Sequence, residues 1–148
     1  DELNNVERIK FSDGTLALDI DPGDTAGQAY RLYQAAFARV PDMPGVAYHM
    51  NDMENNGLVL WNIANNFLAS PEFQSTYGEN PTDEEYVNLL YQNVLGRSAH
   101  PVDEVAWYRE KFDTGAMDWA AALIGFAESP ENVLLVAPQI EDGIWMPF

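Results

Sequence analysis

Two stretches of the chain nearly repeat each other: YQAAFAR at residues 33–39 and YQNVLGR at residues 91–97. A second pair follows in the same order, FLASPEF at residues 67–73 and FAESPEN at residues 126–132. The first pair is offset by 58 positions, from 33 to 91, and the second by 59, from 67 to 126. A nearly constant offset between unlike residue types predicts an internal duplication with one inserted residue.

The repeated units span residues 30–77 and 85–135, which we name copy one and copy two. Trp61 and Trp119 share the offset of 58, so we expect the inserted residue to follow them. Each copy alone is too small to bury a sizeable core. We therefore expect the two copies to pack against each other as one bundle, which would hide the large apolar side chains Phe37, Trp61, Phe67, Leu95, Trp119 and Phe126.

The fold class that the sequence predicts is mainly α. Apolar residues recur at helical spacing from Thr25 onward, and helices are expected over residues 25–40, 44–55, 58–69 and 83–97. Ser70 and Ser129 each precede Pro-Glu, which is an N-cap followed by a favourable first helical residue and an acid at the positive end of the helix dipole. Thr82 and Glu85 form a capping box.

Residues 1–24 differ from the rest because residues 6–20 predict a β-hairpin. Two runs of alternating apolar residues flank Ser12-Asp13-Gly14, which has the composition of a tight turn. This lead-in either caps one end of the bundle or pairs with a strand outside the chain. The duplicated helical domain then covers residues 25–148, with a C-terminal tail at 136–148. Because the chain does not begin with Met, we expect it to be part of a longer protein.

The composition excludes several classes of partner. The 148 residues include 7 Lys and Arg against 24 Asp and Glu, a net charge of −17. Nucleic acid is not expected as a partner because phosphate binding needs a basic surface. No cysteine is present, which excludes disulfides and thiolate metal sites. No apolar run is long enough to predict membrane insertion, and no cleaved N-terminal signal is recognisable.

The strongest candidates for a metal site are Asp19, Asp21 and Asp24, whose carboxylates alternate in a tight turn as calcium ligands do. The loop lacks the glycine and the final glutamate of an EF-hand, and Asp24 has an alternative role as a helix cap. Calcium is therefore the one cofactor that the sequence suggests. The alternative explanation of the acidic composition is a well-solvated surface.

The residues that recur between the copies have structural explanations. We expect Arg39 and Arg97 to bond the last carbonyls of their helices, Asp42 to cap the next helix, and Gly45 to complete that turn. The two histidines, His49 and His100, belong to no catalytic motif, and no catalytic residue is assigned.

Aromatic residues leave a further alternative open. They could form a sugar-stacking face, but their helical spacing favours the core. The residues concerned are Tyr30, Tyr33, Tyr48, Trp61, Tyr91, Trp107, Tyr108 and Trp119.

Copy one contains the pattern YxxxxxRxPDxxG from Tyr33 to Gly45, followed by FxxSPEF from Phe67. These motifs resemble domain of unknown function 4214, a helical family similar to phycobilisome linker repeats. Copy two departs from the pattern at Ser98-Ala99-His100, where Pro-Asp is expected, and at Asp103, where Gly is expected. It also has Asn132 in place of the last Phe. The resemblance covers roughly three quarters of the chain.

The resemblance implies a secreted bacterial protein, with such domains lying beside repeats-in-toxin calcium segments and leaving the cell by type I secretion. An acidic stretch precedes the apolar end of the chain, as in many type I signals. The expected signal residues are Ile144, Trp145, Met146, Pro147 and Phe148. The alternative role for this tail is a strand packed on the core, and the two roles are compatible.

The expected function is a non-enzymatic accessory or interaction domain that supports type I export or extracellular attachment. Its expected partners are the type I secretion machinery and a protein or surface polysaccharide. Its expected location is extracellular or at the cell surface. The alternatives are a calcium-dependent module that folds after export and a carbohydrate-binding surface domain. An enzyme with an unrecognised carboxylate site is the least favoured.

Overall fold

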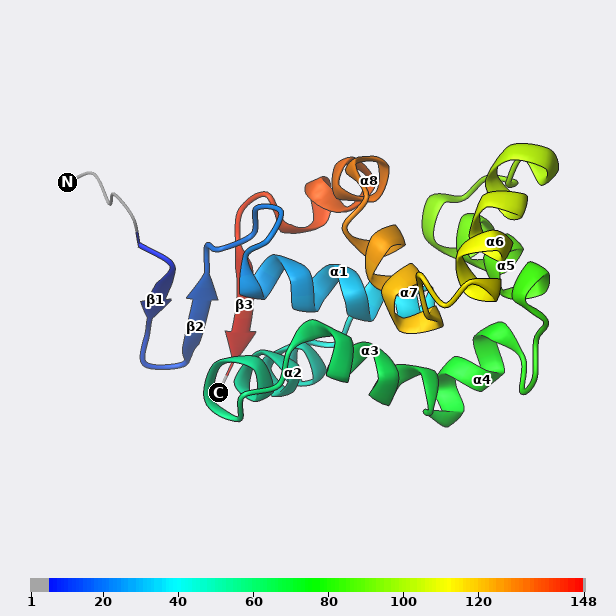
Figure 1. Ribbon diagram of the computed structural model, residues 1–148. Coiled ribbons are helices and arrows are strands. Elements are labelled where there is room, and N and C mark those ends of the chain that lie inside the picture. Colours follow the sequence, from blue (N-terminus) through cyan, green and yellow to red (C-terminus); the bar gives the residue numbers. More distant parts are fainter. Residues whose placement is uncertain (1–5, 148) are drawn as a thin grey trace.

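The computed structural model describes residues 6–147 and is mainly helical, with a small antiparallel sheet at one end (Figure 1). This confirms the predicted fold class and the N-terminal hairpin. In chain order the helices are α1 (Thr25–Phe37), α2 (Met43–Asn55), α3 (Leu60–Leu68), α4 (Pro71–Tyr77), α5 (Asp83–Leu95), the π-helical turn η1 (Pro101–Val105), α6 (Ala106–Asp113), α7 (Trp119–Ala127) and α8 (Pro130–Ile140).

The helices of the second half begin at regular offsets from those of the first. Helices α1 and α2 begin at 25 and 43, and α5 and η1 begin at 83 and 101, an offset of 58 in both cases. Helices α3 and α4 begin at 60 and 71, and α7 and α8 at 119 and 130, an offset of 59. The duplication remains an inference, which these matching bounds support.

These bounds place the inserted residue in the loop before α7, earlier than the tryptophans suggested. Trp61 is the second residue of α3, whereas Trp119 is the first residue of α7, so the two do not occupy equivalent positions. Trp61 is 48% exposed, and its indole Nε1 donates a hydrogen bond to Asp118 Oδ2 at 2.8 Å. The expectation that Trp61 is hidden in the core was therefore wrong, because its polar nitrogen is bonded at the surface.

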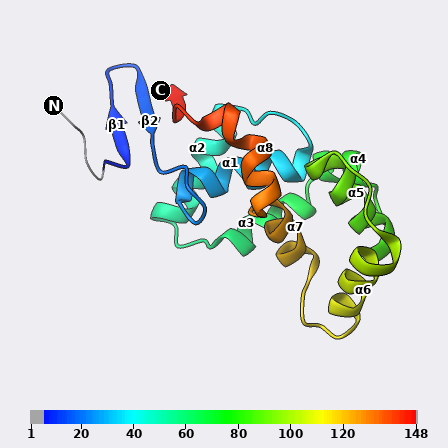
Figure 2. The same ribbon diagram turned by 90° about the horizontal axis from the view of Figure 1, so that it is seen from above.

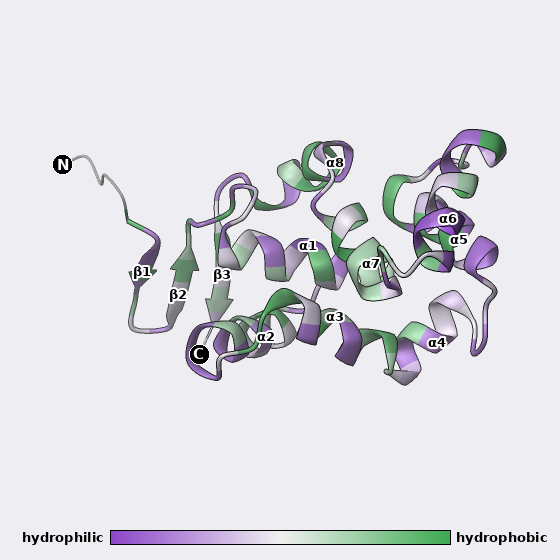
Figure 3. Cartoon of the chain, viewed as in Figure 1, coloured by the Kyte–Doolittle hydropathy of each residue, from purple (hydrophilic) through white to green (hydrophobic). Residues whose placement is uncertain are grey.

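The main core lies where α7 packs against both α1 and α3. Helix α7 is apolar along most of its length, as its colouring in Figure 3 shows. Phe37, Phe67 and Phe126 are buried there as expected, and Leu95 and Trp119 are partly buried. An apolar helix that contacts two helices of the other half explains why neither copy would form this core alone.

Three strands form the sheet in the order β1 (Arg8–Lys10), β2 (Gly14–Ala17) and β3 (Ile144–Pro147). Both pairings are antiparallel, and Leu16 faces Ile9 on one side and Trp145 on the other. The hairpin therefore pairs with the chain's own C-terminal strand rather than with a strand from outside. Ile144 and Met146 point inward and join a second apolar cluster with Val46 and Met50 of α2.

Gly14 allows this pairing because a Cβ there would lie 2.5 Å from the Trp145 ring.

The sheet and the α5–α6 pair lie at opposite ends of the molecule in both views (Figures 1 and 2). Among residues 6–147, no single helix is long and apolar enough to cross a membrane. Helices α7 and α8 reach that length and apolarity only when taken together, and the chain bends by 57° between them.

Candidate functional site

The first cluster of recurring residues surrounds Arg39. Helix α1 ends when Ala38 adopts a left-handed conformation (φ 51°), which turns the chain away from the helix axis. Arg39 Nε then donates to Glu72 Oε1 in the first turn of α4 at 2.6 Å, and its guanidinium lies 5.1 Å from the centre of the Tyr33 ring. The bond to Glu72 raises the pKa of Arg39.

The second cluster has the same plan around Arg97. Gly96 ends α5 in a left-handed conformation (φ 66°). Arg97 Nε donates to Glu131 Oε1 of α8 at 2.9 Å, and the guanidinium lies 4.8 Å from the Tyr91 ring. Arg97 also pairs with Glu104 at 3.2 Å.

The sequence suggested that these arginine side chains bond the last carbonyls of their own helices, but neither side chain does so. Only the backbone N–H of Arg97 donates to its own helix, at the Tyr91 carbonyl. Each arginine lies two residues beyond the end of its helix, directly after a residue in the left-handed conformation. The chain turns there, so the Arg39 side chain reaches α4 and the Arg97 side chain reaches α8. Arg39 and Arg97 are therefore links between α1 and α4 and between α5 and α8.

Asp42 occupies the N-cap of α2, where its Oδ1 accepts a hydrogen bond from the Gly45 N–H at 2.8 Å. The Tyr33 hydroxyl donates to the other carboxylate oxygen, and this bond lowers the pKa of Asp42. Position 45 requires glycine because the Tyr33 ring lies so close to its backbone that a Cβ there would be 2.7 Å from the ring. The Asp42 carboxylate thus stays ionised and bonded to its own turn.

Copy two retains this cap with a different residue. His100 lies at the N-cap of η1, and its Nδ1 accepts from the Asp103 N–H at 3.3 Å. The sequence had suggested that copy two lost the turn together with Pro-Asp. The cap survives because a neutral imidazole nitrogen accepts a hydrogen bond as a carboxylate oxygen does.

The tyrosines of the two clusters are not poised for acid–base chemistry at neutral pH. Burial raises the pKa of Tyr33 and raises the pKa of Tyr91 to about 12. The backbone N–H of His100 donates to Glu104 and lowers the pKa of that carboxyl group. All of these groups therefore keep their usual charge near pH 7, which is consistent with a structural role.

The three aspartates proposed for calcium do not converge. Asp19 forms an ion pair with Arg8 and accepts from the Ala26 N–H at 3.0 Å. Asp24 accepts from the backbone N–H of Asp21 at 3.2 Å and stands at the N-cap of α1, without a side-chain bond to that helix. Within residues 6–147, no three Asp, Glu or His side chains gather as a metal-binding group. Calcium binding by this loop stays a prediction.

His49 is half-buried in the aromatic packing. Its ring meets Phe67 edge-on with centroids 4.6 Å apart and lies 6.4 Å from Tyr33. Its Nδ1 is buried and has no hydrogen-bond partner among the described residues. Burial lowers the pKa of His49, so the ring is held in its neutral form.

The residues proposed as a secretion signal form β3, apart from Phe148, which lies outside the described residues. Ile144 and Met146 are buried, whereas Trp145 is 39% exposed. The structure thus shows the strand role of this tail. The signal role stays a prediction.

The aromatic residues divide between core and surface. Tyr30, Tyr33 and Tyr91 are buried, and Tyr108 and Trp119 are partly buried, as helical spacing indicated. The exposed members are Tyr48, Trp61 and Trp107.

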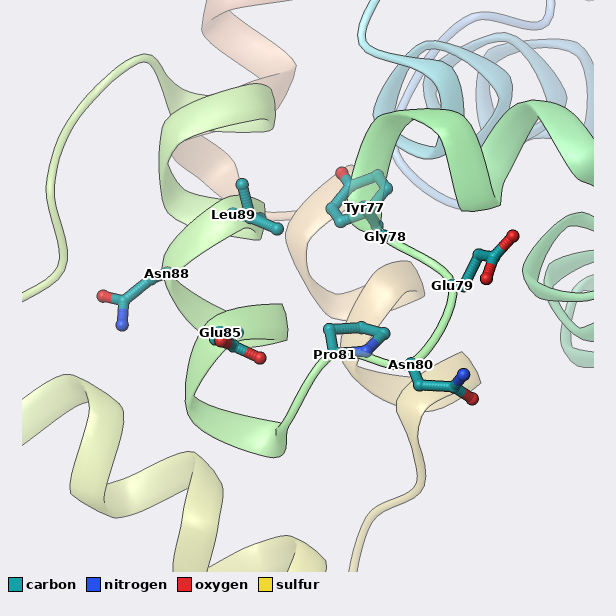
Figure 4. Close-up of a pocket in the computed structure, with 8 residues that line it drawn as sticks. All are labelled: Tyr77, Gly78, Glu79, Asn80, Pro81, Glu85, Asn88 and Leu89. Carbon is teal, nitrogen blue, oxygen red and sulfur yellow. The ribbon is translucent and has the colours of Figure 1, made fainter.

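A hollow of about 490 Å³ lies between the end of α4 and the start of α5. Tyr77, Pro81 and Leu89 form its apolar wall, while Glu79 and Asn88 point away from it on opposite sides (Figure 4). Glu85 also lines this hollow, but its carboxylate accepts from the Thr82 N–H at 2.8 Å, so the two acidic side chains of the hollow do not converge.

Sequence reasoning missed two polar contacts. Arg31 is 1% exposed, forms an ion pair with Glu128 and donates to the Ile20 carbonyl at 2.8 Å. Nothing local signals this pair, which joins residues 97 positions apart. Asp118 caps α7 by accepting from the Ala121 N–H at 2.7 Å, and an Asp before an apolar run was the available signal.

Residues 64–136 match the family model described as Domain of unknown function (DUF4214). The match runs from within α3 to within α8, and so contains Ser70, Arg97 and Ser129 but neither the hairpin nor β3. No curated protein matches the chain. The match supports this domain family for copy two and the end of copy one.

Proposed function

Starting from the match of residues 64–136 to that family of unknown function, we propose that the chain is a non-enzymatic accessory domain of a secreted bacterial protein. It supports type I export or attachment outside the cell, through contacts made by its sheet. The resemblance of the repeated motifs to domains of secreted proteins supports the location.

One observation carries the interaction role: the outer face of the sheet is apolar and exposed. Ile144 and Met146 face the helices, so by strand alternation Trp145, Leu16 and Ile9 face outward. Phe11 is 49% exposed and lies against Trp145, with ring centroids 5.6 Å apart. Contiguous exposed apolar surface of this kind is typical of binding surfaces.

The charge of the chain favours a protein or a neutral sugar surface over a polyanion such as nucleic acid or an anionic membrane. With 24 acidic residues against 7 basic ones, the surface repels nucleic acid and anionic lipid. An apolar sheet face within an acidic surface gives the domain a localised contact area on a molecule that otherwise stays well solvated.

Export is tested by expressing the chain together with a type I exporter and measuring its amount inside and outside the cells. Deleting residues 144–148 is expected to leave the protein inside. Because this deletion also removes β3, the matched control is Met50→Ala, which leaves every tail residue in place and truncates a buried side chain of the same apolar cluster. It costs about 2–4 kcal/mol of stability by opening a cavity in the core.

We expect Met50→Ala to be exported despite its lower stability, since the signal would be read in the unfolded chain. Continued export of the deletion variant would contradict the signal role. Equal retention of both variants would show that the tail matters only as a strand.

A further inference from the structure

Strand β1 presents an open edge. The sheet order is β1-β2-β3, so within residues 6–147 β1 has a neighbouring strand on one side alone. It is the outermost strand in both views (Figures 1 and 2). The bonds to β2 use the carbonyl of Glu7 and the N–H of Phe11. In an antiparallel pair bonding residues alternate, so the backbone groups of Arg8 and Lys10 point to the open side.

The side chains of Arg8 and Lys10 share the face that looks toward α2. They border a hollow of about 390 Å³, together with Met50, Glu54 and Met146. The charge of Arg8 is already matched by Asp19 and by Glu54, the latter at 2.5 Å. Lys10 is exposed and has no ion-pair partner among residues 6–147. One cation therefore remains available beside an open strand edge.

The opposite face of β1 is apolar. Ile9 is partly buried, and Phe11, just beyond the strand, is exposed against Trp145. A fourth strand would place alternate side chains on these two faces. One set would lie beside Arg8 and Lys10 and the other beside Ile9 and Phe11.

We propose that the open edge of β1 binds an extended segment of another protein as a fourth strand. The segment carries an acidic side chain beside Lys10 and apolar side chains on the face of Ile9 and Phe11. Backbone hydrogen bonds supply affinity, and the alternating faces supply selectivity. This inference rests on the interaction role proposed above and states the chemistry of the partner.

A second copy of the chain fits this edge less well. Antiparallel pairing of β1 with itself would bring Arg8 and Lys10 against the same residues of the other molecule, and like charges opposite each other destabilise a strand pair. Each molecule also carries a charge of −17. Lys10 thus disfavours self-association, as lysines on edge strands do, while favouring an acidic partner.

The test adds capped synthetic hexapeptides to the purified full chain and follows backbone amides by NMR. One peptide alternates Val with Glu, and the other alternates Val with Lys. We expect the Val–Glu peptide to shift the amides of Arg8 and Lys10 and to slow their hydrogen exchange. Lys10→Glu should weaken this binding about fivefold, because an opposite-charge pair becomes a like-charge pair.

The matched control is Lys111→Glu, which makes the same charge change on α6 at the other end of the molecule and should leave binding unchanged. The inference is overturned if neither peptide shifts these amides, or if both shift them equally. It is also overturned if the amides shift with protein concentration alone, which would identify a second copy as the occupant. Export is measured in a separate experiment. If the chain is exported but does not bind the peptide, the strand-binding inference is wrong and the proposed export role is unaffected.

Discussion

His49 and His100 show how one residue type serves two purposes at the scale of single residues. His100 is exposed and replaces the aspartate that caps the equivalent helix in copy one. His49 instead packs against Phe67, and its Nδ1 has no partner within residues 6–147. A cap needs only one acceptor at the right place, whereas a buried nitrogen without a partner reduces stability.

Replacing His49 by Phe should therefore raise the free energy of unfolding at pH 7 by up to about 1 kcal/mol. It should also reduce acid sensitivity. Burial lowers the pKa of His49, so below about pH 6.5 the unfolded chain binds more protons than the folded one, and stability falls as the pH is lowered. Urea unfolding at pH 7.5 and pH 5 measures both effects.

The control is Met50→Leu, a conservative change at another buried position of α2 that involves no titratable group and should leave the pH dependence unchanged. If His49→Phe kept the full acid sensitivity of the original chain, the neutral buried ring would not be its source.

At the scale of elements, helix starts depend on a few side-chain caps. Ser70 accepts from the Phe73 N–H and Ser129 from the Asn132 N–H, both at 3.2 Å. Thr82 and Glu85 bond each other's backbone N–H groups, as the capping box predicted. Each contact spans three residues, which is why the local sequence was sufficient to place these helices.

Ser70→Ala and Ser129→Ala should each lower the free energy of unfolding by about 1 kcal/mol, because one helix N–H group loses its side-chain acceptor in each variant. Ser75→Ala is the matched control. Ser75 lies inside α4, is exposed, and donates to the Pro71 carbonyl of its own helix. Its loss should change stability little. Thermal or urea unfolding of the three variants measures the difference, and equal losses would show that capping is not the cause.

At the scale of the whole molecule, the ends of the chain are tied to the helices by contacts between distant residues. Strand β3 pairs with β2, and Tyr30 of α1 donates to Gln139 of α8 at 2.8 Å. The Arg31–Glu128 pair joins α1 to the loop before α8, and Arg31 also bonds the carbonyls of the lead-in. These links make the hairpin and the helices one unit.

Glu128→Ala should cost about 3 kcal/mol, since it leaves the Arg31 guanidinium buried without its counter-charge. Glu131→Ala removes the exposed partner of Arg97 and should cost less than about 1 kcal/mol. Denaturant unfolding compares the two directly. Similar losses would mean that burial does not control the strength of these pairs.

The sequence by itself predicted helices α1 to α5 and the start of α8, the caps at Ser70, Thr82 and Ser129, and the hairpin turn. These features depend on residues a few positions apart, so the local sequence pattern is sufficient to predict them. It also indicated the core phenylalanines, because helical periodicity selects one face.

Only the tertiary structure decided which helices and strands contact one another. Leu16 pairs with Trp145, Arg31 with Glu128, and Arg39 with Glu72. The open edge of β1 likewise follows from β3 taking the other side of the hairpin. Such contacts depend on how whole elements pack, and a local pattern carries no information about which distant side chain will arrive beside it.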